Sequence, residues 1–99
     1  MKNKFLTLLG FAKKANHVTS GDEGVKAFLK KGKIKLLIMA EDYPEKRKNF
    51  WKETAESMNI DFIEICDKES LGRAIGTSPR ALVGILDEKM AESLKNIVK

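Results

Sequence analysis

The sequence predicts an α/β fold in which helices cover both faces of a sheet. Two observations lead to this prediction. Segments whose apolar residues have helical spacing alternate with short apolar runs, in the order helix–helix–strand–helix–strand–helix–strand–helix. One of these runs, 35–40 (KLLIMA), contains five apolar residues in succession, which is typical of a central strand covered on both faces. Strands separated by helices are typical of layered α/β architectures.

The first two predicted helices lie in the N-terminal third. The apolar residues of the first helix recur with helical spacing, at Phe5, Leu8, Leu9, Ala12 and Ala15. A second helix should begin after Ser20, because Ser20 and Glu23 have the spacing of a capping box. Its buried stripe would be Val25, Phe28 and Leu29. We expect Gly32 to end this helix.

The third predicted helix follows the strand 35–40. Pro44 suits the first turn of a helix, and the helix should run to about Met58 with Trp51, Ala55 and Met58 facing inward. The remaining elements are a strand over 61–66, a short helix over 68–76, a strand over 81–87 and a last helix from Glu88. The apolar stripe of the last helix is Met90, Leu94, Ile97 and Val98.

The composition sets the class of protein. At 99 residues and 42% hydrophobic content, we expect a single domain, 1–99, with its own core. No stretch of about 18 consecutive apolar residues is present, and the N-terminal apolar run is short, so we expect neither a membrane span nor a signal peptide. Cys66 is the only cysteine, which excludes an intramolecular disulfide and favours a cytoplasmic protein.

The residues give little support to catalysis. His17 and Cys66 are the only histidine and cysteine, so a Cys–His pair is conceivable, but Cys66 ends an apolar strand and we favour a buried, inert thiol. Asp42 follows the strand 35–40, where a catalytic acid could lie, and we favour a cap of the next helix instead. We therefore predict no catalytic residue, metal site, cofactor or small-molecule substrate.

The positive charge of the chain is concentrated near its start. The formal net charge is +5, and residues 1–35 hold nine lysines against two acids, whereas residues 36–69 hold five basic and nine acidic residues. This asymmetry fits a basic surface for nucleic acid or another polyanion, and equally a solvated lysine-rich surface.

Two adjacent acids, Asp22 and Glu23, lie between glycines inside this basic third. They could simply stabilise the positive end of the helix dipole. A helix N-terminus also offers unpaired N–H groups, and Gly21 would allow a ligand to approach closely. Lysines would then bind phosphates while a carboxylate reads base edges. If Glu23 serves the capping box, Asp22 is the freer group for reading bases.

Four segments in order, LLGFAKKA (8–15), TSG (19–21), KGKIKLLIMAED (31–42) and LGRAIG (71–76), resemble a known family. It is the kink-turn RNA-binding ribosomal protein family of the L-seven-Ae and L-thirty-e type, and the likeness is strongest to short bacterial YlxQ-type members. The resemblance implies a compact three-layer α/β/α sandwich with a small mixed central sheet of about four strands. It also implies a protein without catalytic activity, associated with ribosomes, that binds kink-turns: sharply bent internal loops with tandem sheared G·A pairs. We expect a monomer, because nothing in the sequence demands a dimer.

The resemblance also implies a site made of two segments. The first holds Thr19, Ser20, Gly21, Asp22, Glu23, Gly24 and Lys26; the second holds Thr77, Ser78, Pro79 and Arg80. The first matches the family pattern Gly-x-Asn-Glu in position but not in side chain, because Glu23 falls on the Asn and Gly24 on the Glu. A family lysine falls on Ala27, beside Lys26. The differences at Gly24 and Ala27 leave an alternative open: a protein–protein adaptor on the same scaffold with weak or lost kink-turn recognition.

Overall fold

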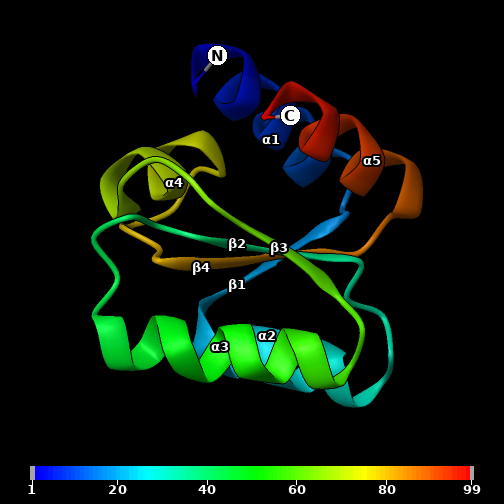
Figure 1. Cartoon of the computed structure of the whole chain (residues 1–99). Coiled ribbons are helices and arrows are strands. Elements are labelled where there is room, and N and C mark those ends of the chain that lie inside the picture. Colours follow the sequence, from blue (N-terminus) through cyan, green and yellow to red (C-terminus); the bar gives the residue numbers. More distant parts are fainter. Residues whose placement is uncertain (1, 99) are drawn as a thin grey trace.

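The computed structural model describes residues 2–98, which form three layers (Figure 1). The central layer is a sheet of four strands: β1 (Val18–Ser20), β2 (Leu36–Met39), β3 (Asp61–Glu64) and β4 (Leu82–Ile85). Three helices cover one face: α1 (Lys2–Lys14), α4 (Lys68–Ala74) and α5 (Glu88–Ile97). Two helices cover the other: α2 (Gly21–Lys30) and α3 (Glu45–Ser57). The predicted α/β/α sandwich is confirmed.

The sheet is mixed, with the strand order β1-β4-β2-β3. β2 and β3 are parallel, whereas β4 is antiparallel to both β2 and β1. The pattern of apolar residues predicted three of these strands and missed β1, which has only three residues and so cannot show a clear alternation. β1 is an edge strand that pairs with β4, with Val18 opposite Ile85 and Ser20 opposite Val83.

The uninterrupted apolar run of β2 follows from its position between two cores. Leu36 and Ile38 face the core under α1, α4 and α5, whereas Leu37 and Met39 face the core under α2 and α3. Trp51 and Ala55 are fully buried in the second core, as predicted. The prediction for Met58 is wrong: α3 ends at Ser57, and Met58 is 44% exposed.

Two candidate catalytic groups have structural roles. The Asp42 Oδ1 atom accepts a hydrogen bond from the backbone N–H of Lys68, the first residue of α4, at 3.0 Å. The prediction that Asp42 caps the next helix, α3, is wrong, because the N-cap residue of α3 is Pro44. Cys66 is buried, as predicted, and burial raises the pKa of its thiol. His17 precedes the first residue of β1, whereas Cys66 follows the end of β3. The strand register puts these points at opposite ends of the sheet, so no Cys–His pair forms.

Candidate nucleic-acid interface

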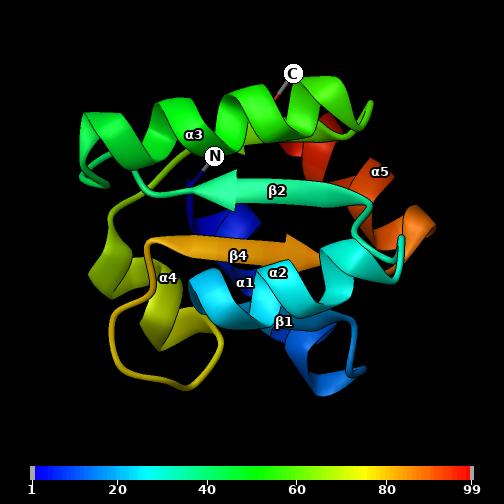
Figure 2. The ribbon, with the colours of Figure 1, turned by 90° about the horizontal axis from the view of Figure 1, so that it is seen from below.

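The antiparallel pairing of β1 with β4 brings together the two segments of the predicted site. Because Ser20 ends β1 opposite the beginning of β4, the N-terminus of α2 lies beside the loop 77–80, which precedes β4 (Figure 2, left). The two segments touch: Arg80 Nε donates a hydrogen bond to Ser20 Oγ at 3.2 Å, across 60 residues of sequence. Residues 19–26 and 77–80 therefore form one surface, which we call the interface.

The loop 77–80 is held in shape by α4. The backbone N–H of Thr77 donates to the Gly72 carbonyl at 2.8 Å. A Cβ atom added at Gly72 would lie 2.3 Å from the Ser78 carbonyl oxygen and 2.8 Å from Pro79 Cα. Only glycine allows the loop to pack this closely on the helix.

Arg80 ties the loop to itself and to α2. One guanidinium nitrogen donates to Ser78 Oγ at 2.7 Å and to the Pro79 carbonyl at 3.2 Å, while Nε reaches Ser20. The backbone N–H of Arg80 also donates to the Lys68 carbonyl at 3.0 Å, at the start of α4. The loop is thus preformed, with a partly exposed cation at its end.

The first turn of α2 has no side-chain cap. Ser20 has the extended backbone of an N-cap (φ −144°, ψ 157°), but its side chain makes no capping hydrogen bond, so the predicted capping box is wrong. The other helices with an N-cap side chain differ: Asp67 accepts from Ser70 N at 2.7 Å and Asp87 from Met90 N at 2.9 Å. In α2 the Ser20 hydroxyl binds Arg80 instead, which leaves the first N–H groups of the helix free of side-chain acceptors.

The prediction that Asp22 is the freer of the two acids is wrong. The Asp22 carboxylate accepts a hydrogen bond from the Tyr43 hydroxyl at 2.8 Å and forms an ion pair with Arg47. Tyr43 is buried, and burial raises the pKa of its phenol, which therefore stays protonated and donates. Asp22 thus links α2 to the beginning of α3. Glu23 is exposed and, among residues 2–98, has no hydrogen bond or ion pair, so Glu23 is the freer carboxylate.

Sequence reasoning missed the part of α3 that adjoins this surface. Lys26 Nζ and Arg47 Cζ each lie 6.0 Å from the centre of the Phe50 ring, which is 46% exposed. Arg47 and Phe50 are three residues apart and so share one helix face. An arginine and a phenylalanine at that spacing, within the first two turns after Pro44, are a signal that could have pointed to this region.

Gly24, the residue that falls on the family glutamate, has a packing role. A Cβ atom added at Gly24 would lie 2.6 Å from Thr19 Oγ1. The absence of a side chain at position 24 therefore accommodates the threonine on β1.

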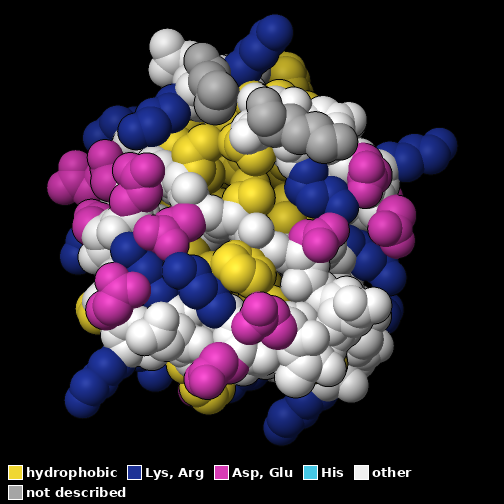
Figure 3. Space-filling model, in the orientation of Figure 1, with side chains coloured by type: hydrophobic (Ala, Val, Ile, Leu, Met, Phe, Trp, Pro, Cys, Tyr) yellow, Lys and Arg dark blue, Asp and Glu magenta, His cyan; other side chains and the backbone are white. Residues whose placement is uncertain are grey.

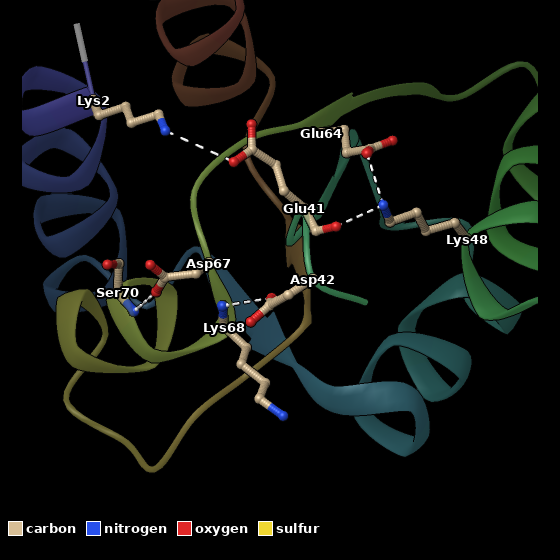
Figure 4. A network of polar contacts seen from close by, with 8 residues as sticks. All are labelled: Lys2, Glu41, Asp42, Lys48, Glu64, Asp67, Lys68 and Ser70. Atoms are coloured by element: carbon tan, nitrogen blue, oxygen red, sulfur yellow. Dashed lines mark hydrogen bonds and ion pairs between the residues drawn. The ribbon is translucent and has the colours of Figure 1, made fainter. Parts of the chain in front are cut away.

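Acidic side chains lie at the end of the sheet where β2 and β3 finish, and most of them are bound by the fold. These residues, which we call the acidic flank, are Glu41, Asp42, Glu64, Asp67 and Glu69. Asp and Glu side chains gather at the left of the face in Figure 3, and Figure 4 shows the partners of Glu41, Asp42, Glu64 and Asp67. Lys48, only 7% exposed, donates to Glu64 Oε2 at 2.9 Å and to the Glu41 carbonyl at 2.7 Å. The hydrogen bond between Lys48 and Glu64 lowers the pKa of Glu64 and raises the pKa of Lys48.

Cations lie near the β1 edge. These residues, the basic flank, are Lys13, Lys14, Lys26, Arg73 and Arg80. Within the part of the chain that the structure describes, only Arg73 of this set has a carboxylate within 4.0 Å, and that contact, to Glu69, is highly exposed. Exposed pairs of this kind are weak, so the basic flank is available to an external anion.

Two other features are absent from residues 2–98. No helix there is long and apolar enough to cross a membrane. No cluster of three or more histidine, cysteine or acidic side chains is arranged there to hold a metal ion.

Comparisons with known proteins agree with this fold. Two bacterial relatives are both named RNA-binding protein YlxQ. The one from Enterococcus faecium is 26% identical over 98 residues, covering 99% of this chain and 94% of the relative. The one from Bacillus subtilis is 24% identical over 95 residues, covering 96% and 95%.

Solved structures show the same architecture. A protein of unknown function from Bacillus halodurans superposes with a TM-score of 0.91 at 28% identity, covering 96% of each chain. The Giardia lamblia 15.5 kD RNA-binding protein superposes with a TM-score of 0.81 at 22% identity, covering 98% of this chain and 83% of the other, which shows the fold alone. The sequence profile described as "Ribosomal protein L7Ae/L30e/S12e/Gadd45 family" matches residues 3–95, so the chain belongs to this family.

Proposed function

We propose that this protein binds structured RNA without catalysing a reaction, and that its ligand is a kink-turn. The observation that carries the proposal is the contact between the uncapped start of α2 and the preformed loop 77–80. Family membership and the names of the bacterial relatives support RNA as the ligand class. In this proposal the protein acts as a monomer in the cytoplasm, in association with ribosomes.

Each part of the interface has a chemical task in this proposal. The free N–H groups at the start of α2 and the side chains of Lys26 and Arg80 bind backbone oxygens of the RNA. Gly21, at φ +80° and with nothing within 4 Å of an added Cβ, leaves room for the ligand. Glu23 accepts hydrogen bonds from base amino groups, and Pro79 packs against an extruded base.

An irregular RNA suits this surface better than a regular duplex. The major groove of A-form RNA is too deep and narrow for side chains to read, so proteins recognise bends, bulges and loops. The interface offers an exposed acid flanked by cations rather than a continuous basic stripe. Such a surface fits a sheared G·A pair, which presents base edges to the protein where the RNA backbone also comes close to it.

The test is a titration with a kink-turn duplex and a control duplex whose G·A pairs are replaced by Watson–Crick pairs. We expect the kink-turn to bind at least about tenfold more tightly, a difference of about 1.4 kcal/mol. The affinity should also fall steeply with salt, because phosphate contacts release counterions. Equal binding to both duplexes would show phosphate binding without base reading.

A second outcome would favour the alternative function. Gly24 and Ala27 stand where the family has a glutamate and a lysine, so two side-chain contacts of the family are absent. No binding to either duplex at moderate salt would reject the RNA proposal and favour a protein–protein adaptor on the same scaffold.

A further inference from the structure

A groove between α1 and α4 begins where the interface ends. Its volume is about 520 Å³, and Gly76, the residue before the loop 77–80, lines it. Leu6, Phe11 and Ile75 supply apolar walls. The groove therefore continues the surface of the interface beyond the loop, along the helix layer that the interface itself does not use.

Phe11 is the most exposed large apolar side chain of residues 2–98, at 56% exposure. It borders this groove and also a second groove of about 530 Å³ along α1. The ammonium group of Lys14 lies 5.9 Å from the ring centre. An exposed aromatic ring beside cations is the arrangement on which unpaired bases stack in proteins that bind single strands.

The charges around the groove favour a polyanion. Three cations line it, Lys13, Lys14 and Arg73, and no acid does. Among residues 2–98, neither lysine has a carboxylate within 4.0 Å, and Arg73 has only the exposed contact with Glu69. The acidic flank, beyond the ends of β2 and β3, would repel a phosphate backbone, and its residue Glu69 lies 4.0 Å from Arg73. A strand that leaves the loop 77–80 is thus attracted away from these acids, toward Lys13 and Lys14 on α1.

We propose that this groove binds an unpaired segment of the same RNA, adjacent to the structured element held by the interface. A base stacks on Phe11, and the neighbouring phosphates lie at Lys13, Lys14 and Arg73. This inference rests on the proposed function and extends the RNA footprint to α1.

The first experiment compares the kink-turn duplex with and without a four-nucleotide unpaired pyrimidine extension, placed in turn at each strand end. We expect the extension at one end to tighten binding about thirtyfold, the middle of the range measured for stacking of one base on an aromatic side chain. Phe11→Leu keeps an apolar side chain without a ring and should remove that gain. Phe11→Tyr should retain it. Both variants should bind the unextended duplex like the wild type.

The second experiment tests the binding of phosphates by the lysines. Lys13→Gln combined with Lys14→Gln should lower the slope of log affinity against log salt by about 2 for the extended RNA only, because each lysine that binds a phosphate contributes about 1 to the slope. The matched control is Lys33→Gln combined with Lys89→Gln, which removes the same charge from two residues that do not line the groove. This control should show no change of slope specific to the extension.

The outcomes separate the two proposals. If the wild type fails to bind the unextended kink-turn, the proposed function is wrong and the groove inference falls with it. If the duplex binds but no extension improves affinity, only the groove inference is overturned. A gain that survives Phe11→Leu would also overturn it, because the strand then lies elsewhere on the protein.

Discussion

The acidic flank and the basic flank use their charges differently. In the acidic flank, Glu64 accepts a hydrogen bond from Lys48, and Asp42 and Asp67 accept hydrogen bonds from the first N–H groups of α4. The cations of the basic flank have almost no anionic partner in residues 2–98. Charge in the acidic flank therefore contributes to folding, whereas charge in the basic flank is available to a ligand.

The difference gives a rule for substitutions. Changes in the acidic flank should alter the free energy of unfolding and leave RNA affinity unchanged. Changes in the basic flank should mainly alter RNA affinity. Four predictions test this separation.

The largest effect is expected at Gly72, which lies in α4 and supports the loop of the interface. Gly72→Ala should lower the free energy of unfolding by about 3 kcal/mol, because the new Cβ would lie 2.3 Å from the Ser78 carbonyl oxygen. RNA affinity should fall as well, since the loop must move. Denaturant unfolding and RNA titration measure the two effects.

A glycine away from the loop supplies the control for Gly72. Gly32 has φ +69° and nothing within 4 Å of an added Cβ, so Gly32→Ala should cost only about 1–2 kcal/mol of backbone strain, with affinity unchanged. If Gly72→Ala instead bound RNA normally, the loop would not depend on α4.

Arg80→Ala should weaken RNA binding by about 1–3 kcal/mol, because it removes a charge-assisted hydrogen bond to the RNA. The substitution also removes the hydrogen bonds of Arg80 to Ser20 and Ser78, so the free energy of unfolding should fall by about 1 kcal/mol. Lys89→Ala, which removes one exposed charge outside the interface, is the matched control. Unchanged affinity in Arg80→Ala would remove Arg80 from the interface.

Substitutions of the neighbouring acids Asp22 and Glu23 should separate an effect on folding stability from an effect on RNA affinity. Asp22→Asn weakens the link to Tyr43 and Arg47 and should cost about 1–2 kcal/mol of folding stability, with little effect on affinity. Glu23→Gln should leave the melting temperature unchanged and weaken kink-turn binding by about 1 kcal/mol. The opposite pattern in the two variants would restore Asp22 as the base-reading group.

The smallest effect is expected at Glu64, and it depends on pH. Lys48 lowers the pKa of Glu64 in the folded protein, so the folded state binds this proton less readily than the unfolded chain does. The stabilisation is complete above the unfolded pKa of about 4.3 and is lost as the pH falls through the lower folded value.

Glu64→Gln should therefore be less stable than the wild type near neutral pH and should approach it in acid, with RNA affinity at neutral pH unchanged. Urea unfolding from pH 7 to pH 3 gives the comparison. Stability curves that stay parallel over this range would show that Lys48 does not stabilise the Glu64 carboxylate.

The local pattern of apolar residues predicted the helices and strands that have enough buried apolar residues to show a period. β2 and α3 were placed correctly because their apolar residues follow the period of a strand or a helix over enough residues. β1 was not predicted, because its three residues form a strand through pairing with β4 and have no clear sequence pattern of their own. The resemblance to a family named the two segments of the predicted site, and the register of β1 on β4 explains why they meet.

The roles of single side chains were less predictable. Ser20 and Glu23 have the spacing of a capping box, but Arg80, 60 residues away, takes the serine hydroxyl. Asp22 was expected to be free, yet Tyr43 and Arg47 bind it across the junction of α2 and α3. Such interactions depend on how elements pack, and no local sequence pattern specifies them.

The contact between Gly24 and Thr19 has a consequence for the divergence of the family. A Cβ atom at position 24 would lie 2.6 Å from the Thr19 hydroxyl oxygen, so a glutamate there requires that hydroxyl to rotate or disappear. The two positions are therefore coupled, and their substitutions are not additive. Gly24→Glu should therefore be tolerated better in a Thr19→Ala background than in the wild type, because the alanine removes the hydroxyl that the new side chain would meet.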